Sequence, residues 1–417
     1  MLVNEFHVPK RTQTYADVLV AVGLAKLLSL WPQTNSIQLR DRGAHYQLLL
    51  SKPLDWKQAR QAPLGPVYPY ILFKPTDPKP KAASELIDYS HERQIEEAYR
   101  KYVEATRNRE SKQAAQVAET APPTPREDLQ LFKDFNSLRM GSPAYSKLYL
   151  ALEEIPEELP LLVLNRLSDL LPSGVTVEWT KVPEPNLPAS SLQLFSPITG
   201  KGVHRPKADG AGVGQFSKKL IDWFEEWMKY IAMHVILSSH RAGDNTIVLA
   251  IAPEDISLDG LATVRRELLR KGLWGNLKVE INATLSIAQS LIANSEFANR
   301  GVIRLRGRRP NQLVRGIYIS YFKSLGTGKA LMNNAFLGIP GWFPIETQED
   351  ADAWLAILDE HSRLIRGLAE NKSDHLPLLV AYRDFISGGR LKDLLDFLVS
   401  YGIMTMSHLE DRRWVRH

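Results

Sequence analysis

The chain contains no cysteine among its 417 residues. This absence excludes disulfide bonds, thiol nucleophiles, and zinc or iron–sulfur sites built on cysteine ligands. It fits a reducing compartment, and we expect a cytoplasmic protein. No targeting segment stands out either, because the largely apolar stretch 15–31 is interrupted by Asp17 and Lys26. That stretch is predicted to be an amphipathic core helix, and neither a signal peptide nor a membrane span.

The motifs of several common catalytic sites are missing as well. Gly326-Thr327-Gly328-Lys329 resembles the end of a phosphate-binding P-loop, but Lys323 stands where that pattern needs glycine and Ala330 where it needs serine or threonine. Neither H-E-x-x-H nor G-x-S-x-G occurs. His234 and His240 have no obvious carboxylate partner and are interpreted as structural. We therefore predict a protein that is not an enzyme and uses no metal or cofactor.

Acidic residues are missing from one long segment, 297–345, where about five would be expected at the average content of the chain. Its basic residues are Arg300, Arg304, Arg306, Arg308, Arg309, Arg315, Lys323 and Lys329. The aromatic residues between and after them are Tyr318, Tyr321, Phe322, Trp342 and Phe343. Guanidinium groups match phosphate oxygens, and aromatic rings can stack on unpaired bases. The segment therefore predicts a track for nucleic acid, whereas the net charge of +5 decides little.

A second basic segment, 195–219, combines cations with five glycines and a single acid, Asp209. Its candidate nucleic-acid-binding residues are Lys201, His204, Arg205, Lys207, Lys218 and Lys219. Such a glycine density favours a loop without regular structure. A helix over 216–239 is predicted to follow, and a loop entering a helix N-terminus can offer amides and cations to a phosphate. The alternative is an ordinary surface loop.

The pattern of apolar residues and breakers predicts an α+β protein. It has a mixed α/β N-terminal and central region and a C-terminal helical bundle. We divide it into an N-terminal α/β domain with a charged linker at 1–125, a central α/β nucleic-acid-binding region at 126–345, and the helical bundle at 346–417. Pro122-Pro123-Thr124-Pro125 marks the first boundary.

Individual elements follow from periodicity and turn residues. A hairpin is predicted around Asp41-Arg42-Gly43. The other predicted strands are 175–179, 245–252 and 277–281, and the central helices are 256–271 and 285–298. This β-α-β-α alternation is typical of an α/β or ferredoxin-like unit. After residue 346 the composition changes to 13 acidic against 9 basic residues, and helices are predicted at 350–370, 376–387 and 391–402.

Several short motifs, in their order along the chain, are similar to one family. They are Phe195-Ser196-Pro197, Gly200-Lys201-Gly202, Arg205-Pro206-Lys207-Ala208, Trp223-Phe224 and Tyr321-Phe322-Lys323-Ser324-Leu325-Gly326. They follow an N-terminal helix and hairpin and precede a terminal helical bundle. In this order the chain resembles the large subunit of the type I CRISPR Cascade effector complexes, which serve in antiviral defence. The resemblance extends loosely over most of the chain.

The resemblance implies a non-catalytic subunit of a ribonucleoprotein complex. Such a subunit lies near the 5′ end of the guide RNA, helps to recognise the protospacer-adjacent motif in duplex DNA, and opens the duplex. Its expected partners are guide RNA, target DNA, the other Cascade subunits, and a recruited nuclease or transposition protein, but no membrane. The resemblance does not indicate which residues recognise the protospacer-adjacent motif. From its glycines and charges, we expect the loop 199–219 to contact duplex DNA, with Lys201, Arg205 and Lys207 as candidates.

Two other functions stay open. One is a metal-dependent nuclease or nucleotidyl enzyme whose site is assembled from scattered carboxylates. The other is a scaffold whose basic segments bind partner proteins. A metal-dependent cleavage assay separates the nuclease from the RNA-guided subunit, and co-purification of a small RNA separates the subunit from the scaffold.

Overall fold

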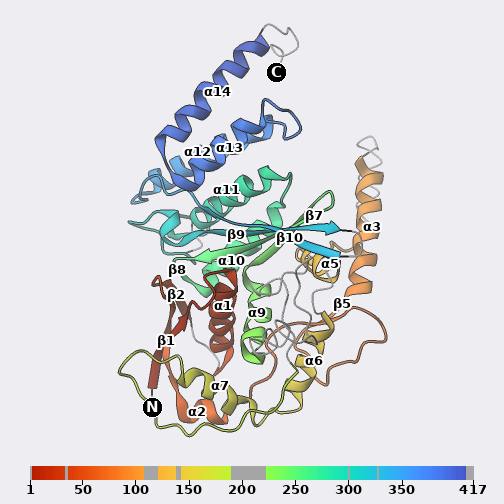
Figure 1. Ribbon diagram of the computed structural model, residues 1–417, viewed down its shortest axis with the longest axis vertical. Helices are drawn as coiled ribbons and strands as arrows, with labels where there is room; N and C mark the ends of the chain where they lie inside the picture. Colours follow the sequence, from red (N-terminus) through yellow and green to blue (C-terminus); the bar gives the residue numbers. More distant parts are fainter. Residues whose placement is uncertain are drawn as a thin grey trace, which may run out of the picture.

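The computed structural model describes residues 2–32, 36–107, 121–137, 142–188, 222–298, 301–325 and 328–409. These residues form two four-stranded antiparallel sheets, a two-stranded parallel sheet and many helices, which confirms the predicted α+β class. The molecule is elongated, with the N-terminal elements at one end and the last helix at the other (Figure 1). Within the described residues, no helix combines the length and the apolar composition needed to cross a bilayer.

The first sheet has the order β1-β3-β2-β8. Its strands are β1 (Leu2–Pro9), β2 (Ile37–Asp41), β3 (His45–Asp55) and β8 (Asp255–Ser257). The predicted hairpin around residues 41–43 is confirmed as the β2–β3 turn, whereas β1 and β8 were not predicted. Because β8 is more than 200 positions from β2 in the chain, this sheet joins the N-terminal and central thirds of the sequence.

Helix α1 (Tyr15–Leu30) covers one face of the first sheet and packs along α9 (Trp223–Ile236) (Figure 1). Its predicted start is confirmed, since the Thr14 side chain accepts a hydrogen bond from the amide of Ala16. Gly23 lies where the two helices are closest. A Cβ atom at this position would lie only 1.9 Å from the carbonyl oxygen of Met228. Glycine therefore sets the separation of α1 and α9.

We expect Gly23→Ala to lower the free energy of unfolding by about 1–3 kcal/mol or more, because the added methyl group meets rigid backbone rather than a movable side chain. Thermal unfolding followed by circular dichroism measures this. Gly402→Ala is the matched control, since no atom of the described residues lies within 4 Å of a Cβ there. The control should be neutral or stabilise by about 0.5 kcal/mol through its higher helix propensity. Equal stability of the two variants would contradict the close helix contact.

The second sheet has the order β10-β9-β7-β6. Its strands are β6 (Leu237–Ala242), β7 (Asn245–Pro253), β9 (Val314–Leu325) and β10 (Gly328–Gly338). Strand β7 confirms the prediction at 245–252. The helix predicted to continue to residue 239 ends at Ile236, where β6 begins.

The predicted strand at 277–281 is wrong, and with it the β-α-β-α alternation. Residues Leu277–Ala293 form one helix, α11. The apolar residues Val279, Ile281 and Leu285 stand at spacings of two and four, as a strand would also allow. Because α11 is buried on nearly all sides, it has no solvent-exposed polar face. The sequence therefore does not show the apolar–polar period that normally identifies a helix. The segment 175–179 is not a strand either; the Trp179 indole donates to Asn165 and its ring packs against Trp56.

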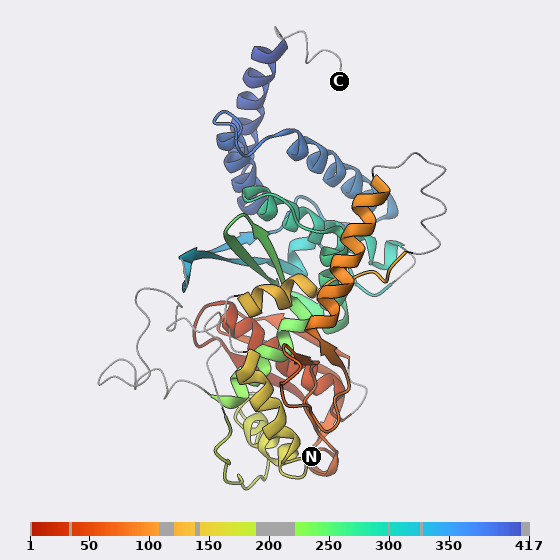
Figure 2. The same cartoon turned by 90° about the vertical axis from the view of Figure 1, so that its right-hand side faces the viewer.

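The remaining elements complete the body of the molecule. They are α2 (Trp56–Gln61), β4 (Tyr70–Leu72), β5 (Leu86–Asp88), α3 (Tyr89–Arg107), α5 (Leu129–Ser137), α6 (Ser142–Glu153), α7 (Leu159–Ser168) and α10 (Leu258–Lys271). Helix α3 runs along one side of the molecule, on the right in Figure 1 and toward the viewer in Figure 2.

The three predicted C-terminal helices are confirmed as α12 (Gln348–Gly367), α13 (Leu376–Gly388) and α14 (Leu391–Leu409). Helices α12 and α13 pack on α11, and α14 packs on α13 and extends toward the C-terminus (Figures 1 and 2). Trp342 stacks on Trp354 of α12, with ring centroids 4.7 Å apart. Buried apolar residues from all three predicted domains belong to one core. The division at 125 and 345 stays a prediction.

His234 of α9 lies in this core beside Phe132 and Tyr230. Burial, together with the nearby Arg265 guanidinium, lowers the pKa of His234 to about 3. The folded imidazole therefore stays neutral, whereas the unfolded chain takes up a proton below its ordinary pKa of about 6.5.

We expect His234 to reduce the free energy of unfolding as the pH falls below about 6.5, by up to about 1.4 kcal/mol per pH unit. The effect is absent above this pH and grows until the pH reaches the folded pKa. Urea denaturation at about pH 7.5 and about pH 5.5 measures it, with His234→Leu as the comparison. The stability difference between the two pH values should be smaller in the variant. An unchanged difference would contradict a neutral buried imidazole.

Candidate nucleic-acid interface

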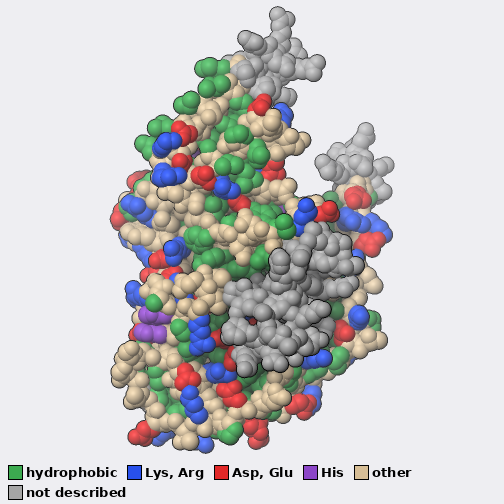
Figure 3. All heavy atoms as spheres, in the orientation of Figure 1, with side chains coloured by type: hydrophobic (Ala, Val, Ile, Leu, Met, Phe, Trp, Pro, Cys, Tyr) green, Lys and Arg blue, Asp and Glu red, His purple; other side chains and the backbone are tan. Residues whose placement is uncertain are grey.

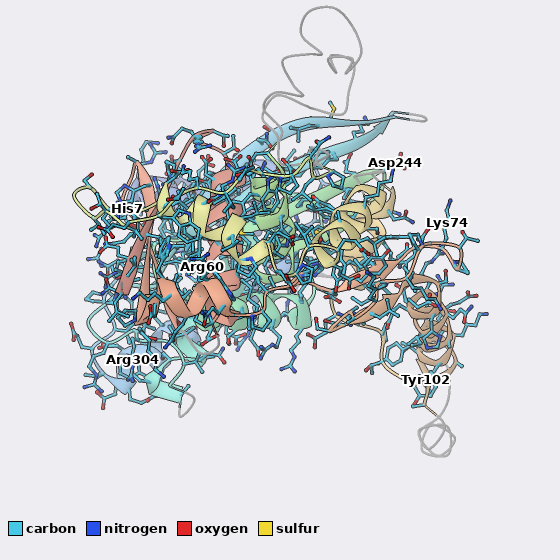
Figure 4. The ribbon with its side chains drawn as sticks, turned by 90° about the horizontal axis from the view of Figure 1, so that it is seen from below. His7, Arg60, Lys74, Tyr102, Asp244 and Arg304 are labelled. Atoms are coloured by element: carbon cyan, nitrogen blue, oxygen red, sulfur yellow. The ribbon has the colours of Figure 1, made fainter. Side chains whose placement is uncertain are left out.

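The structure divides the predicted basic track between two sides of the molecule. Figure 4 shows Arg304 on the same side as His7, and Asp244 on the opposite side. Lys323 pairs in register with Asn245, next to Asp244, near the far end of β9. Along an extended strand Lys323 is about 27 Å from Arg315. The side chain of Lys329 and all of Arg300 lie outside the described residues, so the track is not one continuous patch over the part that the structure describes.

The aromatic residues of this segment are used for packing. Phe322 is buried in the second sheet. The Tyr321 hydroxyl donates to the carboxylate of Glu280, and Trp342 stacks between the C-terminal helices against Trp354. Phe322 is buried and offers no free face to a base. Tyr321 and Trp342 are partly exposed, so base stacking on them stays a prediction.

Four arginines instead line one cleft of about 630 Å³, which we call the arginine cleft. They are Arg40 of β2, Arg42 of the β2–β3 turn, Arg308, and Arg315 of β9. The other residues that line it are Asp41, Glu254, Asp255, Asn311 and Gln312. The first sheet and the segment that leads into the second sheet thus bring residues about 270 positions apart into one site.

Asp255 of β8 holds two of the four guanidinium groups. Its Oδ1 accepts from Arg40 Nε at 3.0 Å, and its Oδ2 accepts from Arg308 Nη2 at 3.1 Å. Arg308 also donates to the backbone oxygen of Gln312 at 2.7 Å. Arg308 is therefore an anchor of the cleft wall. Arg40 can also contact a ligand, because 37% of its side chain is exposed.

Asp41 holds a second group of cations. Both of its oxygens accept from Lys10 Nζ at 2.6 Å, and Arg315 Nη1 lies 3.6 Å from Oδ2. The longer pair leaves Arg315 largely free to contact a ligand, and 57% of its side chain is exposed. Arg42 donates to the side-chain oxygen of Gln47 at 2.8 Å and is otherwise exposed.

The cleft keeps an excess of positive charge. Lys10 and the four arginines face three acids, Asp41, Glu254 and Asp255. Burial, together with the charge of Asp41, raises the pKa of Glu254 above its ordinary value. Guanidinium groups oriented by carboxylates and partly exposed are suited to phosphate oxygens, since they can donate two parallel hydrogen bonds. Such contacts position a nucleic acid without reading its sequence.

The other predicted arginines lie outside the cleft. Arg304, Arg306 and Arg309 are exposed. The Glu296 carboxylate accepts hydrogen bonds from the amides of Leu305 and Arg306, which fixes the loop that carries them. These three arginines remain available for electrostatic attraction. The predicted loop residues Lys201, His204, Arg205, Lys207, Lys218 and Lys219 lie outside the described residues.

A larger hollow of about 920 Å³ lies between α3 and α5. Its cations are Arg93, Arg100 and Lys133, and its acids are Glu96, Glu97 and Glu104. Lys133 is paired with Glu96 at 2.5 Å. Because the charges balance, this hollow is a weaker candidate for phosphate than the arginine cleft. Basic and acidic side chains are also interspersed over the face drawn in Figure 3.

Sequence reasoning found Arg308 and Arg315 but missed Arg40, Arg42 and Lys10. Arg42 stood in the predicted hairpin turn, which was the only signal for this group. Nothing in the sequence places this turn beside residues 308–315, because the contact depends on β8 pairing with β2.

Among the described residues no group of three or more histidine, aspartate or glutamate side chains is arranged to hold a metal ion. No protein-family model matches the chain, and no curated protein matches it.

Proposed function

We propose that this chain is the non-catalytic large subunit of a type I CRISPR RNA-guided surveillance complex. In this role it binds guide RNA and target DNA, helps to recognise the protospacer-adjacent motif, and helps to open the duplex. The observation that carries the proposal is the arginine cleft, in which Arg40, Arg42 and Arg315 offer partly exposed guanidinium groups. The choice of the Cascade complex rests on the order of short motifs, which resembles that of the Cascade large subunit.

The charge arrangement supports contact with a phosphate backbone. Asp255 and Asp41 orient the cations while leaving the cleft with more positive than negative groups. A protein that leaves sequence reading to base pairing needs this kind of backbone contact. It does not need a catalytic constellation.

The C-terminal helices support assembly with other subunits. Helix α14 is fixed to α13 through Phe397, which is buried and lies 5.1 Å from the Tyr382 ring between centroids. Its other side exposes apolar side chains, namely Leu391, Leu395, Leu398, Val399, Ile403 and Met406. Exposed apolar surface of this extent is typical of a protein–protein contact. The same observation favours the scaffold as second candidate function.

Affinity purification of the tagged chain from cells that express its genomic neighbours tests the proposal. We expect a bound RNA of one defined length, together with further protein subunits. Recovery of proteins without RNA would favour the scaffold. Cleavage of DNA that needs a divalent metal and is abolished by a single carboxylate substitution would favour the nuclease.

A further inference from the structure

Among the described residues, one face of the first sheet has no helix packed over it. Helix α1 packs on the face formed by buried residues such as Phe6, Leu39 and Leu48 (Figure 1). Because side chains alternate along a strand, the residues between them project to the opposite face. We call that opposite face the histidine face; its residues include Glu5, His7, Gln38, Arg40, His45, Gln47, Leu49 and Asp255.

Two imidazole rings are stacked on this face. His7 of β1 and His45 of β3 are diagonal neighbours across the strand pair, and their ring centroids are 4.1 Å apart at an interplanar angle of 28°. His7 keeps 30% of its side chain exposed, and His45 is also partly exposed. His7 is at the outer edge of the molecule in Figure 4. The pair therefore presents an aromatic surface that protein does not cover completely.

A hydrogen-bonded network fixes the orientation of this surface. The Glu5 carboxylate is 2.6 Å from His7 Nε2 and accepts from the Gln47 amide at 2.6 Å. Gln47 in turn accepts from Arg42 Nε at 2.8 Å. A network of this kind holds the rings in place before any ligand binds, which reduces the entropy cost of binding.

The histidine face is continuous with the arginine cleft. Strand register places His7 beside Gln47, Gln47 beside Arg40, and Arg40 beside Asp255. Arg308 extends this row through its ion pair with Asp255. Stacking rings at one end of a row and guanidinium groups at the other match the two parts of a nucleotide, the base and the phosphate.

We propose that the histidine face binds an unpaired nucleic-acid strand, with bases stacked on His7 and His45 and the backbone passing over Arg40 and Arg42 into the arginine cleft. This inference rests on the proposed function and adds the class of ligand that the cleft receives. Bases within a duplex already stack on one another, so a ring surface selects a strand whose bases are free. A four-stranded sheet face accommodates two or three such bases.

The test compares three forms of the full chain: wild type, His7→Ala with His45→Ala, and His7→Phe with His45→Phe. The probes are fluorescein-labelled single strands of RNA and of DNA of about 12 nucleotides, and a DNA duplex of the same length, followed by fluorescence anisotropy. His91→Ala, an exposed histidine of α3, is the matched control. Thermal unfolding checks each variant, and His45→Ala alone replaces the double variant if that one does not fold.

We expect the double alanine variant to bind single strands about five- to a hundredfold more weakly, the reduction typical of removing one or two stacking interactions. The phenylalanine variant should retain affinity, because stacking needs a ring and not an imidazole nitrogen. Duplex binding and the salt dependence should stay as in wild type, since the substitutions leave every phosphate-binding cation in place. If the single-stranded RNA binds more tightly, the bound strand is the guide RNA. If the single-stranded DNA binds more tightly, the bound strand is the displaced strand of the target.

Three results would overturn the inference: alanine and wild type binding alike, phenylalanine failing to retain affinity, or an equal reduction on duplex and single strand. In each case the proposed function stands if substitution of the cleft arginines still weakens binding. A wild-type chain that binds none of the probes would overturn both.

Discussion

A chain carrying Arg40→Gln, Arg42→Gln and Arg315→Gln should bind nucleic acid on the order of a hundredfold more weakly at low salt, with a salt dependence shallower by about two log–log units. These three guanidinium groups are the exposed cations of the arginine cleft. Each cation that neutralises a phosphate releases about one counterion, so removing it makes the salt dependence shallower. Arg308 stays in place because it anchors Asp255 and the Gln312 carbonyl. Fluorescence anisotropy over a series of salt concentrations measures both quantities.

The matched control carries Arg304→Gln, Arg306→Gln and Arg309→Gln. It removes the same amount of positive charge from the chain, but these side chains lie outside the cleft. Its affinity for nucleic acid and the log–log slope of its salt dependence should change less than those of the cleft variant. If affinity and slope fall equally in the two variants, binding would depend on general charge and the cleft would have no particular role.

A second large effect is expected on assembly. Substituting Leu395→Gln, Val399→Gln and Ile403→Gln should abolish co-purification of the other protein subunits, because each of these residues is at least 50% exposed on the free side of α14. The fold should be retained, since exposed substitutions usually change stability by less than about 0.5 kcal/mol. Nucleic-acid affinity of the isolated chain should not change.

The control for this variant replaces three exposed polar residues of helix α12, with Asp359→Asn, Glu360→Gln and Arg363→Gln. It should assemble as wild type does. Deletion of residues 346–417 is a poorer test, because it removes Trp354 from its stack with Trp342 and uncovers α11. Normal assembly of the α14 variant would mean that the apolar face has another use.

The sequence predicts well those elements whose pattern is local. The apolar run 15–31, Gly43 in a turn, and the three-to-four spacing of the C-terminal helices all predict what the structure contains. It fails at α11, where burial on all sides removes the polar face that distinguishes a helix from a strand. It also fails at β1 and β8, which are short or terminal and are defined by pairing with distant strands.

The candidate site is predicted only in part for the same reason. The segment 297–345, which has no acidic residues, indicates Arg308 and Arg315 as candidates. Strand β9, however, places the two ends of this basic segment on different sides of the molecule. Arg40 and Arg42 join them only because β8 pairs with β2. The stacked pair of His7 and His45 depends on the register of β1 and β3, which no local motif indicates.

The proposed nucleic-acid interface is tested most directly by ultraviolet cross-linking of the purified protein to its bound nucleic acid, followed by mass spectrometry of the cross-linked peptides. The arginine cleft and the histidine face predict adducts on peptides that contain residues 40–47 and 308–315. Substitution of Arg40, Arg42 and Arg315 should remove those adducts. Cross-links confined to α3 and the C-terminal helices, with none on either predicted peptide, would show that nucleic acid binds elsewhere on the molecule.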